Sequence, residues 1–274
     1  MPADPSLPPN LRPGVFAGLA DDYVRYRVPY PAPMLDEMLA GAAVPAAGSR
    51  LLDLACGTGR VALPIAHRFA AIRAIDLEPD MLDAGRREAA RLGIGNIQWG
   101  VGRAEDVEAP ASAFDLVTIG EAFHRLDRPR AAALAFGWLK PGGALATLGA
   151  DSLMDGEAPW RRVVAEVVRS FVGEPARRLG APNAPIAEEI AEQENALSAA
   201  GFAPVTSHRF ATPYEWTAET LLGYLRSTSV LSRAALGARH HAFEAALADA
   251  LLKFDPLGRY VETVGWGYTL ARKP

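Results

Sequence analysis

The chain has 274 residues, of which half are hydrophobic and 22% are charged, and its net charge is −4. This composition indicates a globular protein with a sizeable core and excludes a disordered chain. The slight acidity and the lack of any Lys/Arg block disfavour nucleic acid as a partner. No apolar run approaches the roughly 20 residues that cross a bilayer. The single cysteine, Cys56, excludes an intrachain disulfide and a cysteine-rich metal site. We therefore expect a soluble, cytoplasmic protein without metal or membrane partner.

The N-terminal part of the chain is rich in proline. Residues 1–20 lack the apolar core of a signal peptide, and we expect a flexible tail there. Residues 21–48 predict helical pieces that are interrupted by Pro29, Pro31 and Pro33. This helical segment leads into the main domain.

Apolar strands alternate with helices over residues 49–151. The expected strands span residues 49–55, 72–77, 96–102, 114–120 and 144–150. Helices are expected at residues 58–70, 79–93 and 128–140. Pro79 suits a first helical turn, Asp127 can cap the last of these helices, and the turn at 141–143 stops it. The alternation indicates a parallel sheet covered on both faces, and right-handed crossovers make it doubly wound.

The pattern changes after residue 151. Residues 152–258 predict mainly helices, at 158–173, 186–201, 218–234 and 238–254, with a strand at 202–216. Residues 259–274 predict a final strand. The fold class is therefore a Rossmann-like, mostly parallel α/β sheet with an antiparallel final strand and an added helical cap. We expect 152–190 and 217–258 to cover the ligand end of the sheet, with the proline-containing loop at 173–186 shaping a pocket.

The stretch LLDLACGTGR, residues 51–60, predicts a cofactor loop after the first strand. Gly57, Gly59 and Ala62 fit the glycine pattern of a dinucleotide fold. Asp53, however, would repel a pyrophosphate and suits a cationic ligand such as an ammonium or sulfonium. Asp76, at the end of the second strand, can accept hydrogen bonds from ribose hydroxyls in either kind of cofactor. These residues alone leave both cofactor classes open.

Five motifs then carry a family resemblance. LLDLACGTGR, AIDLEPDML, GRAEDV, FDLVTIGEAFHRLD and LKPGGAL resemble, in order and spacing, the successive motifs of class I S-adenosylmethionine-dependent methyltransferases. YVRYRVPYP and LLGYLRSTSV resemble segments of a small-molecule branch that includes trans-aconitate-methyltransferase-like proteins. The resemblance is good over residues 20–150 and loose elsewhere. Val28, Arg125 and Thr228 depart from it, and they concern the substrate side.

The resemblance implies a set of residues that bind S-adenosyl-L-methionine: Tyr23, Arg27, Asp53, Ala55, Cys56, Gly57, Gly59, Asp76, Leu77, Met81, Ala104, Glu105 and Glu121. In it, Asp53 and the loop backbone hold the methionine portion, and Arg27 pairs with the cofactor carboxylate. Asp76 takes the ribose. Leu77 and Met81 pack on adenine, whose edge meets Ala104 and Glu105, while Glu121 lies near the sulfonium.

Methyl transfer from a sulfonium needs alignment and exclusion of water, and a base only if the nucleophile must lose a proton. His124, after the fourth strand, is the candidate base, and Glu121 is a second one. A structural histidine is the simpler interpretation of His124. The leading hypothesis is an enzyme of the EC 2.1.1 class that methylates oxygen, nitrogen or carbon of a small molecule.

Two other functions stay open at this point. One is an oxidoreductase that uses NAD(P) or flavin, and the other is a non-catalytic protein that binds S-adenosylmethionine. A nucleic-acid methyltransferase is disfavoured, because IGEAFHR stands where an [ND]-P-P-[YF] motif would follow the fourth strand. The sequence leaves the acceptor and the oligomeric state undetermined.

Overall fold

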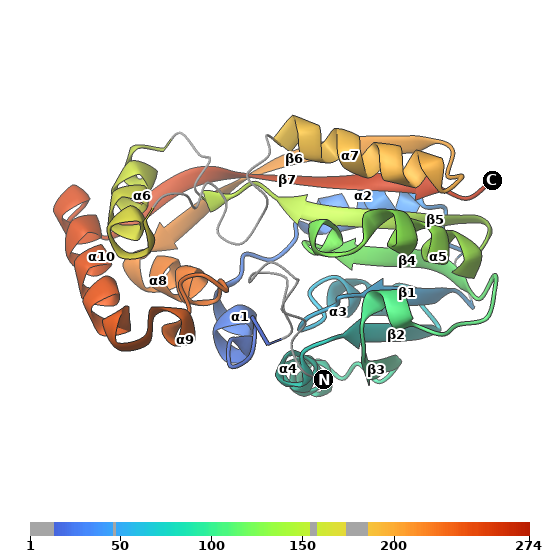
Figure 1. Ribbon diagram of the computed structural model, residues 1–274, viewed down its shortest axis with the longest axis horizontal. Helices are drawn as coiled ribbons and strands as arrows, with labels where there is room; N and C mark the ends of the chain where they lie inside the picture. Colours follow the sequence, from blue (N-terminus) through green and yellow to red (C-terminus); the bar gives the residue numbers. More distant parts are fainter. Residues whose placement is uncertain (1–13, 46–47, 154–157, 174–185) are drawn as a thin grey trace. The chain divides into compact units, whose positions relative to one another are not determined.

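The computed structural model describes residues 14–45, 48–153, 158–173 and 186–274. The chain divides into two compact units (Figure 1). The sheet unit comprises Pro29–Ala150, Ala184–Phe210 and Trp266–Pro274, and the helical unit comprises Met1–Val28, Asp151–Asn183 and Ala211–Gly265. Residues 1–13 of the predicted tail, and nearly all of the loop predicted at 173–186, lie outside the described residues.

Within the described residues the strands form one seven-stranded sheet of order β3-β2-β1-β4-β5-β7-β6. The strands are β1 (Arg50–Leu54), β2 (Ala71–Asp76), β3 (Ile97–Val101), β4 (Phe114–Gly120), β5 (Leu139–Ala150), β6 (Val205–Thr217) and β7 (Arg259–Arg272). The first five strands pair in parallel, and β7 pairs with β5 antiparallel. The predicted fold class is thus confirmed, including the antiparallel final strand. Strand order reverses between β1 and β4, the place where ligands bind in open α/β sheets.

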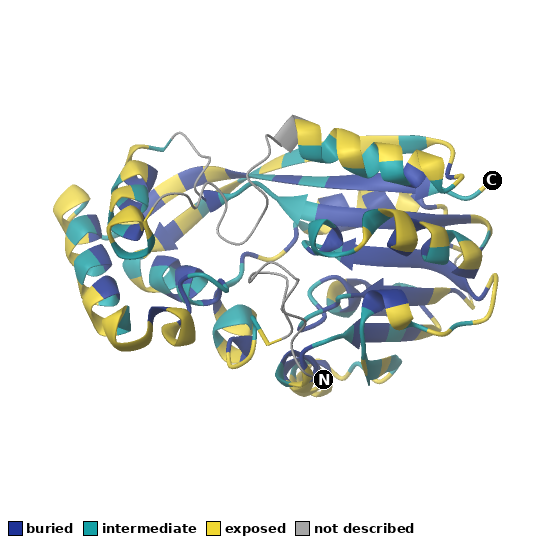
Figure 2. Ribbon diagram, viewed as in Figure 1, coloured by how far each residue is buried: buried dark blue, intermediate teal, exposed yellow. Residues whose placement is uncertain are grey.

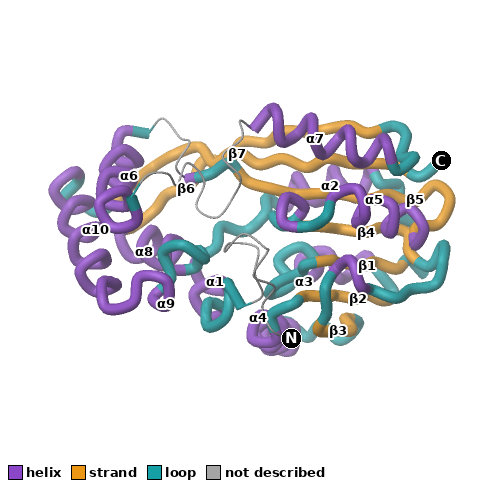
Figure 3. Tube along the Cα trace, in the orientation of Figure 1, coloured by secondary structure: helices purple, strands orange, loops and turns teal. Residues whose placement is uncertain are grey.

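Helices flank these strands in sequence (Figure 3). In the sheet unit they are α2 (Ala32–Gly41), α3 (Ala62–Ile65), α4 (Pro79–Arg91), α5 (Arg128–Trp138) and α7 (Ile186–Ala199), with short 3-10 turns η2 (Ala66–Arg68), η3 (Ala104–Asp106) and η4 (Phe123–Arg125). Pro79 begins α4, as predicted. The Asp127 carboxylate accepts a hydrogen bond from the Arg130 backbone N–H at 3.1 Å, which confirms it as the cap of α5.

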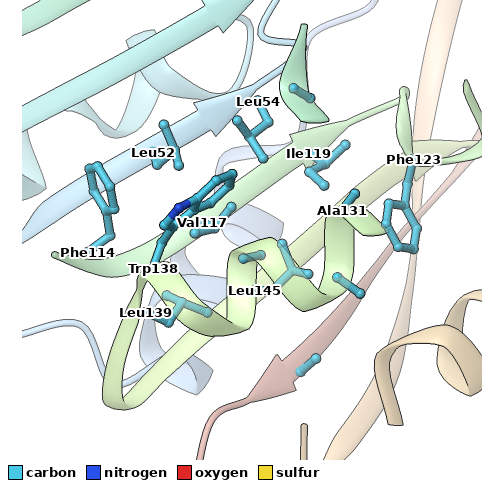
Figure 4. Close-up of a cluster of buried hydrophobic side chains, with 14 of the residues drawn as sticks. Leu52, Leu54, Phe114, Val117, Ile119, Phe123, Ala131, Trp138, Leu139 and Leu145 are labelled. Carbon is cyan, nitrogen blue, oxygen red and sulfur yellow. The ribbon is translucent and has the colours of Figure 1, made fainter. Parts of the chain in front are cut away.

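The sheet is covered on both faces. Trp138 of α5 lies with Leu52 and Val117 in a cluster of buried apolar side chains (Figure 4). Successive residues of a strand face opposite sides. Ala271 of β7 belongs to this cluster, whereas the preceding Leu270 contacts α2 on the other side. The central strands of the sheet are largely buried (Figure 2), as expected for a parallel sheet between two helical layers.

The helical unit contains α1 (Ala20–Tyr26), α6 (Pro159–Val172), α8 (Ala218–Arg226), α9 (Arg233–Leu236), η6 (Gly237–Arg239) and α10 (His240–Phe254). Phe171 of α6 packs on Phe243 of α10, with ring centroids 5.4 Å apart. Arg161 of α6 forms a buried ion pair with Glu262 of β7. No helix of the described residues combines the length and the hydropathy needed to cross a membrane.

Three predicted boundaries are wrong, each for a local reason. The helix expected at 58–70 is replaced by the short α3 and the 3-10 turn η2, which together span 62–68. Pro64 has no N–H to donate and is tolerated only in a first turn, so the helix cannot begin as early as residue 58. The helix expected at 218–234 ends at Arg226. There the hydroxyls of Ser227 and Thr228 donate to carbonyls of the last turn, each at 2.6 Å.

The third error concerns the glycine turn at 141–143. α5 already ends at Trp138, and residues 141–143 belong to β5, which begins at Leu139 rather than at 144. The register of β5 on β4 shifts between Phe114 and Leu116. A local irregularity of the strand thus accommodates the glycines that were predicted to form a turn.

Candidate functional site

The loop that follows β1 is fastened to the end of β2. The Cys56 backbone N–H donates to the Ile75 carbonyl at 3.0 Å, and the Gly57 N–H donates to Asp76 Oδ2 at 2.6 Å. Asp76 Oδ1 accepts the Glu78 N–H at 2.9 Å. The Asp76 carboxylate therefore joins the glycine loop to the start of α4. An ionised carboxylate has about four acceptor positions, so these two bonds leave capacity for ribose hydroxyls.

Gly57 and Gly59 of the loop meet different structural requirements. Gly57 has a φ of 54°, and a Cβ there would meet nothing within 4 Å. Its left-handed backbone is open to an approaching ligand. Gly59 has a φ of 79°, and a Cβ there would lie 2.7 Å from Trp99 of β3. A Cβ at Gly85 of α4 would meet the same indole at 2.7 Å. Gly59 and Gly85 thus make room for Trp99.

Asp53 is a fully buried carboxylate at the end of β1. Its exposed fraction is 0%, and Thr118 on the neighbouring β4 donates to its Oδ1 at 2.7 Å. Its Oδ2 has no hydrogen-bond partner among the described residues. Burial raises the pKa of Asp53 to about 7, and the nearby charge of Asp76 adds to the increase. Burial also raises the pKa of Asp76, against the lowering effect of its backbone hydrogen bonds.

The residues predicted at the adenine are mostly buried against protein. Met81 is 2% exposed and Ala104 is 6% exposed, while Leu77 is half-buried. The Glu105 carboxylate accepts the Asp127 N–H at 3.2 Å and lies 3.7 Å from Arg103. This side chain ties η3 to the start of α5. The contacts of these residues with adenine stay predictions.

Glu121 and His124 follow β4. Glu121 has a φ of 52°, which is strained for a residue with a side chain and costs about 1–3 kcal/mol. Its N–H donates to the Leu148 carbonyl at 2.7 Å. His124 Nδ1 lies 3.9 Å from the Glu189 carboxylate of α7, which also pairs with Arg128 at 3.6 Å. Glu189 and Thr118 were not predicted from the sequence, because each is 65 residues away from its partner.

Tyr23 and Arg27 belong to the helical unit, where they contact each other. The Arg27 guanidinium lies 4.7 Å from the centre of the Tyr23 ring and 5.0 Å from that of Tyr224. Arg27 also donates to the Ser227 hydroxyl at 2.8 Å and to the Ser227 carbonyl at 3.1 Å. These contacts join α1 to the end of α8. The role of Tyr23 and Arg27 at the cofactor stays a prediction.

Cys56 is buried beside Ala74 and Leu82. Burial raises the pKa of its thiol well above the usual range, so the thiol stays protonated at neutral pH. This agrees with a role for the Cys56 backbone rather than for its sulfur.

The sequence is similar to those of known methyltransferases. Residues 51–143 match the family model described as "Methyltransferase domain". An uncharacterized methyltransferase of Mycobacterium tuberculosis is 29% identical over 153 residues, which cover 56% of this chain and 58% of that protein. Aklanonic acid methyltransferase of Streptomyces sp. (strain C5) is 36% identical over 105 residues, which cover 37% and 47% of the two chains. The chain thus spans about half the length of these relatives.

A solved structure has a similar fold. A putative type II methyltransferase from Anaeromyxobacter dehalogenans superimposes with a TM-score of 0.58 and 22% sequence identity, covering 90% of this chain and 97% of that one. At this identity the likeness concerns the fold alone. The match over residues 51–143, however, falls on the glycine loop and on the strand ends around it. Residues 51–143 are therefore similar to known methyltransferase domains in sequence, and the chain resembles solved methyltransferases in fold.

Proposed function

We propose that this protein is a methyltransferase that moves the methyl group of S-adenosyl-L-methionine to oxygen, nitrogen or carbon of a small molecule. The observation that carries the proposal is the pair of carboxylates at the glycine loop. Asp53 and Asp76 are near enough for the charge of one to raise the pKa of the other. Negative charge on these two carboxylates attracts a cationic cofactor, which in turn favours the ionised form of Asp53, and it repels a pyrophosphate.

The residues of the loop fit that cofactor. Asp53 Oδ2 is a buried acceptor without a partner among the described residues, and a cationic group near the loop would compensate its charge. Asp76 has acceptor capacity for ribose hydroxyls, and the open backbone at Gly57 allows close approach. When bound, S-adenosylmethionine supplies a methyl group activated by its sulfonium. The chain then has to align the acceptor and exclude water.

The substrate class is also part of the proposal. The N-terminal YVRYRVPYP and the later LLGYLRSTSV support the small-molecule branch that includes trans-aconitate-methyltransferase-like proteins. Arg226, in the second segment, already holds Asp22 through two hydrogen bonds of 2.9 and 3.1 Å. An acidic acceptor would therefore have to compete with Asp22 for this guanidinium. Trans-aconitate and other small carboxylic acids are the first acceptors to assay, followed by phenols and amines.

Ligand binding tests the function directly. S-adenosylhomocysteine at about 100 times its Kd should raise the free energy of unfolding by about 2.7 kcal/mol, whereas NADH or FAD should not. Thermal and urea unfolding with each ligand measure this. Stabilisation by NADH or FAD alone would contradict the proposal. Binding of S-adenosylhomocysteine without turnover of any acceptor would favour a non-catalytic binding protein.

His124 should act as a base only when the acceptor must lose a proton. With a hydroxyl acceptor, His124→Ala should slow single-turnover methyl transfer by about 10²–10⁴-fold and leave the affinity for S-adenosylhomocysteine unchanged. His67→Ala, which removes an exposed histidine of η2, is the matched control and should change neither. An unaltered rate at every pH from 5 to 9 would remove His124 as the base.

A further inference from the structure

A cluster of three side chains from three separate segments lies at the carboxyl end of β4. Arg60 directly follows Gly59 of the glycine loop. Its Nη1 lies 3.7 Å from Glu121 Oε2, and its guanidinium lies 4.9 Å from the centre of the Tyr30 ring. The Arg60 and Glu121 side chains keep exposed fractions of 15% and 22%. Charged groups of both signs are therefore accessible beside the loop.

The contact between Arg60 and Glu121 is loose. At 3.7 Å it is about 1 Å longer than the pairs of Arg91 with Glu88, at 2.6 Å, and of Arg226 with Asp22, at 2.9 Å. Charge-assisted hydrogen bonds of arginine measure about 2.7–2.9 Å. The pair is thus held by charge attraction, which another carboxylate can replace.

Tyr30 gives Arg60 a second support that does not depend on Glu121. The Tyr30 ring is buried and packs on Trp266, with ring centroids 5.5 Å apart. Its hydroxyl lies so near Gly120 that a Cβ there would be 3.0 Å away. A guanidinium over an aromatic face keeps its position when its carboxylate partner changes.

The backbone is also strained beside the Arg60–Glu121 pair. Among the described residues four non-glycine positions have a positive φ, and two of them are Ala55 and Glu121, at the ends of the neighbouring strands β1 and β4. Such strain persists where the surrounding structure imposes it and is concentrated at ligand sites. Glu121 is therefore held beside the loop at a conformational cost, facing the Arg60 charge.

We propose that Arg60 binds the α-carboxylate of the cofactor's methionine portion and in doing so exchanges its ion pair with Glu121 for one with the ligand. The inference rests on the proposed function and names a further residue of the same site. Arginine suits this task because its planar fork binds a carboxylate through two parallel hydrogen bonds. The exchange moves the Arg60 charge from Glu121 to the ligand carboxylate.

Two ligands that differ only in the amino-acid portion test the proposal. S-adenosylhomocysteine carries the carboxylate, and 5′-methylthioadenosine lacks it. By calorimetry, Arg60→Met should weaken the affinity for S-adenosylhomocysteine about 10- to 100-fold. It should change the affinity for 5′-methylthioadenosine less than about twofold. Arg60→Lys keeps the charge without the fork and should lose less. Arg91→Met, which removes an exposed arginine of α4, is the control and should change neither affinity.

The exchange itself has a separate measurement. Glu121→Gln should increase the affinity for S-adenosylhomocysteine a few-fold, because the carboxylate that competes for Arg60 is gone. This gain in affinity should vanish when Arg60→Met is also present. Equal weakening of both ligands by Arg60→Met, or no weakening, would overturn the proposal. The proposal would also be overturned if Arg27→Met weakened the affinity for S-adenosylhomocysteine but not for 5′-methylthioadenosine, while Arg60→Met weakened neither. Failure of the wild-type protein to bind either ligand would instead overturn the proposed function.

Discussion

Replacing Asp53 with asparagine should stabilise the protein at pH 8 and remove the contribution of this carboxyl to the pH dependence of the free energy of unfolding between about pH 4 and pH 7. In the folded protein burial raises the pKa of Asp53 from 3.8 to about 7. Between these values the folded state holds a proton that the unfolded state has released. The stability contributed by this carboxyl is therefore complete below about pH 4 and is lost as the pH rises through 7.

The pKa change of Asp53, from 3.8 to about 7, corresponds to an effect on the order of 4 kcal/mol. The amide of the substituted asparagine cannot ionise, and its carbonyl can still accept the Thr118 hydroxyl proton. Urea unfolding without cofactor at each pH from 4 to 8 measures the slopes. Asp83→Asn, which removes an exposed carboxylate of α4, is the control and should follow the wild type. Parallel curves for Asp53→Asn and the wild type would contradict the account of Asp53.

Replacing Asp76 with alanine should weaken the binding of S-adenosylhomocysteine by about 1–3 kcal/mol, or roughly 5- to 150-fold in affinity. The change removes the acceptor proposed for the ribose, and it also removes the acceptor that fastens the Gly57 and Glu78 backbone N–H groups. Asp76→Asn keeps one acceptor oxygen and should lose less. Calorimetry gives the affinities, and Asp80→Ala, in the first turn of α4, serves as the charge-matched control.

A modified ligand separates the two roles of Asp76. Wild-type protein should prefer S-adenosylhomocysteine over its 2′-deoxy analogue, and Asp76→Ala should lose that preference if the carboxylate contacts the ribose. A preference that persists in the variant would assign the whole effect to the fastening of the loop. Unchanged affinity for S-adenosylhomocysteine would contradict both roles.

The sequence was sufficient for those features that depend on local pattern. Apolar runs placed the strands, and Pro79 and Asp127 marked helix starts, because each signal acts within one turn of its own helix. The errors arose where side chains or strand register compete with helix propensity. Ser227 and Thr228 end α8 by donating to its carbonyls, although their neighbours favour helix.

The site required information that a single sequence does not carry. Thr118 meets Asp53 only because of the register of β4 on β1, and the proximity of Glu189 to His124 depends on how α7 packs in the sheet unit. Arg60 followed a recognised motif, yet its contacts with Tyr30 and Glu121 come from distant segments. Motifs therefore located the loop, while the partners of its side chains came from tertiary structure.

The size of the Trp99 side chain restricts which residues fit at positions 59 and 85. Because its indole fills the space that side chains at Gly59 and Gly85 would need, the three residues form one steric unit across the loop, β3 and α4. A single larger residue at either glycine has to displace the indole, whereas a smaller residue in place of Trp99 makes room for alanine at Gly85. At Gly59 the left-handed backbone still restricts the choice. Engineering of this cofactor loop must therefore begin at the edge strand, by choosing the residue at position 99 before those it constrains.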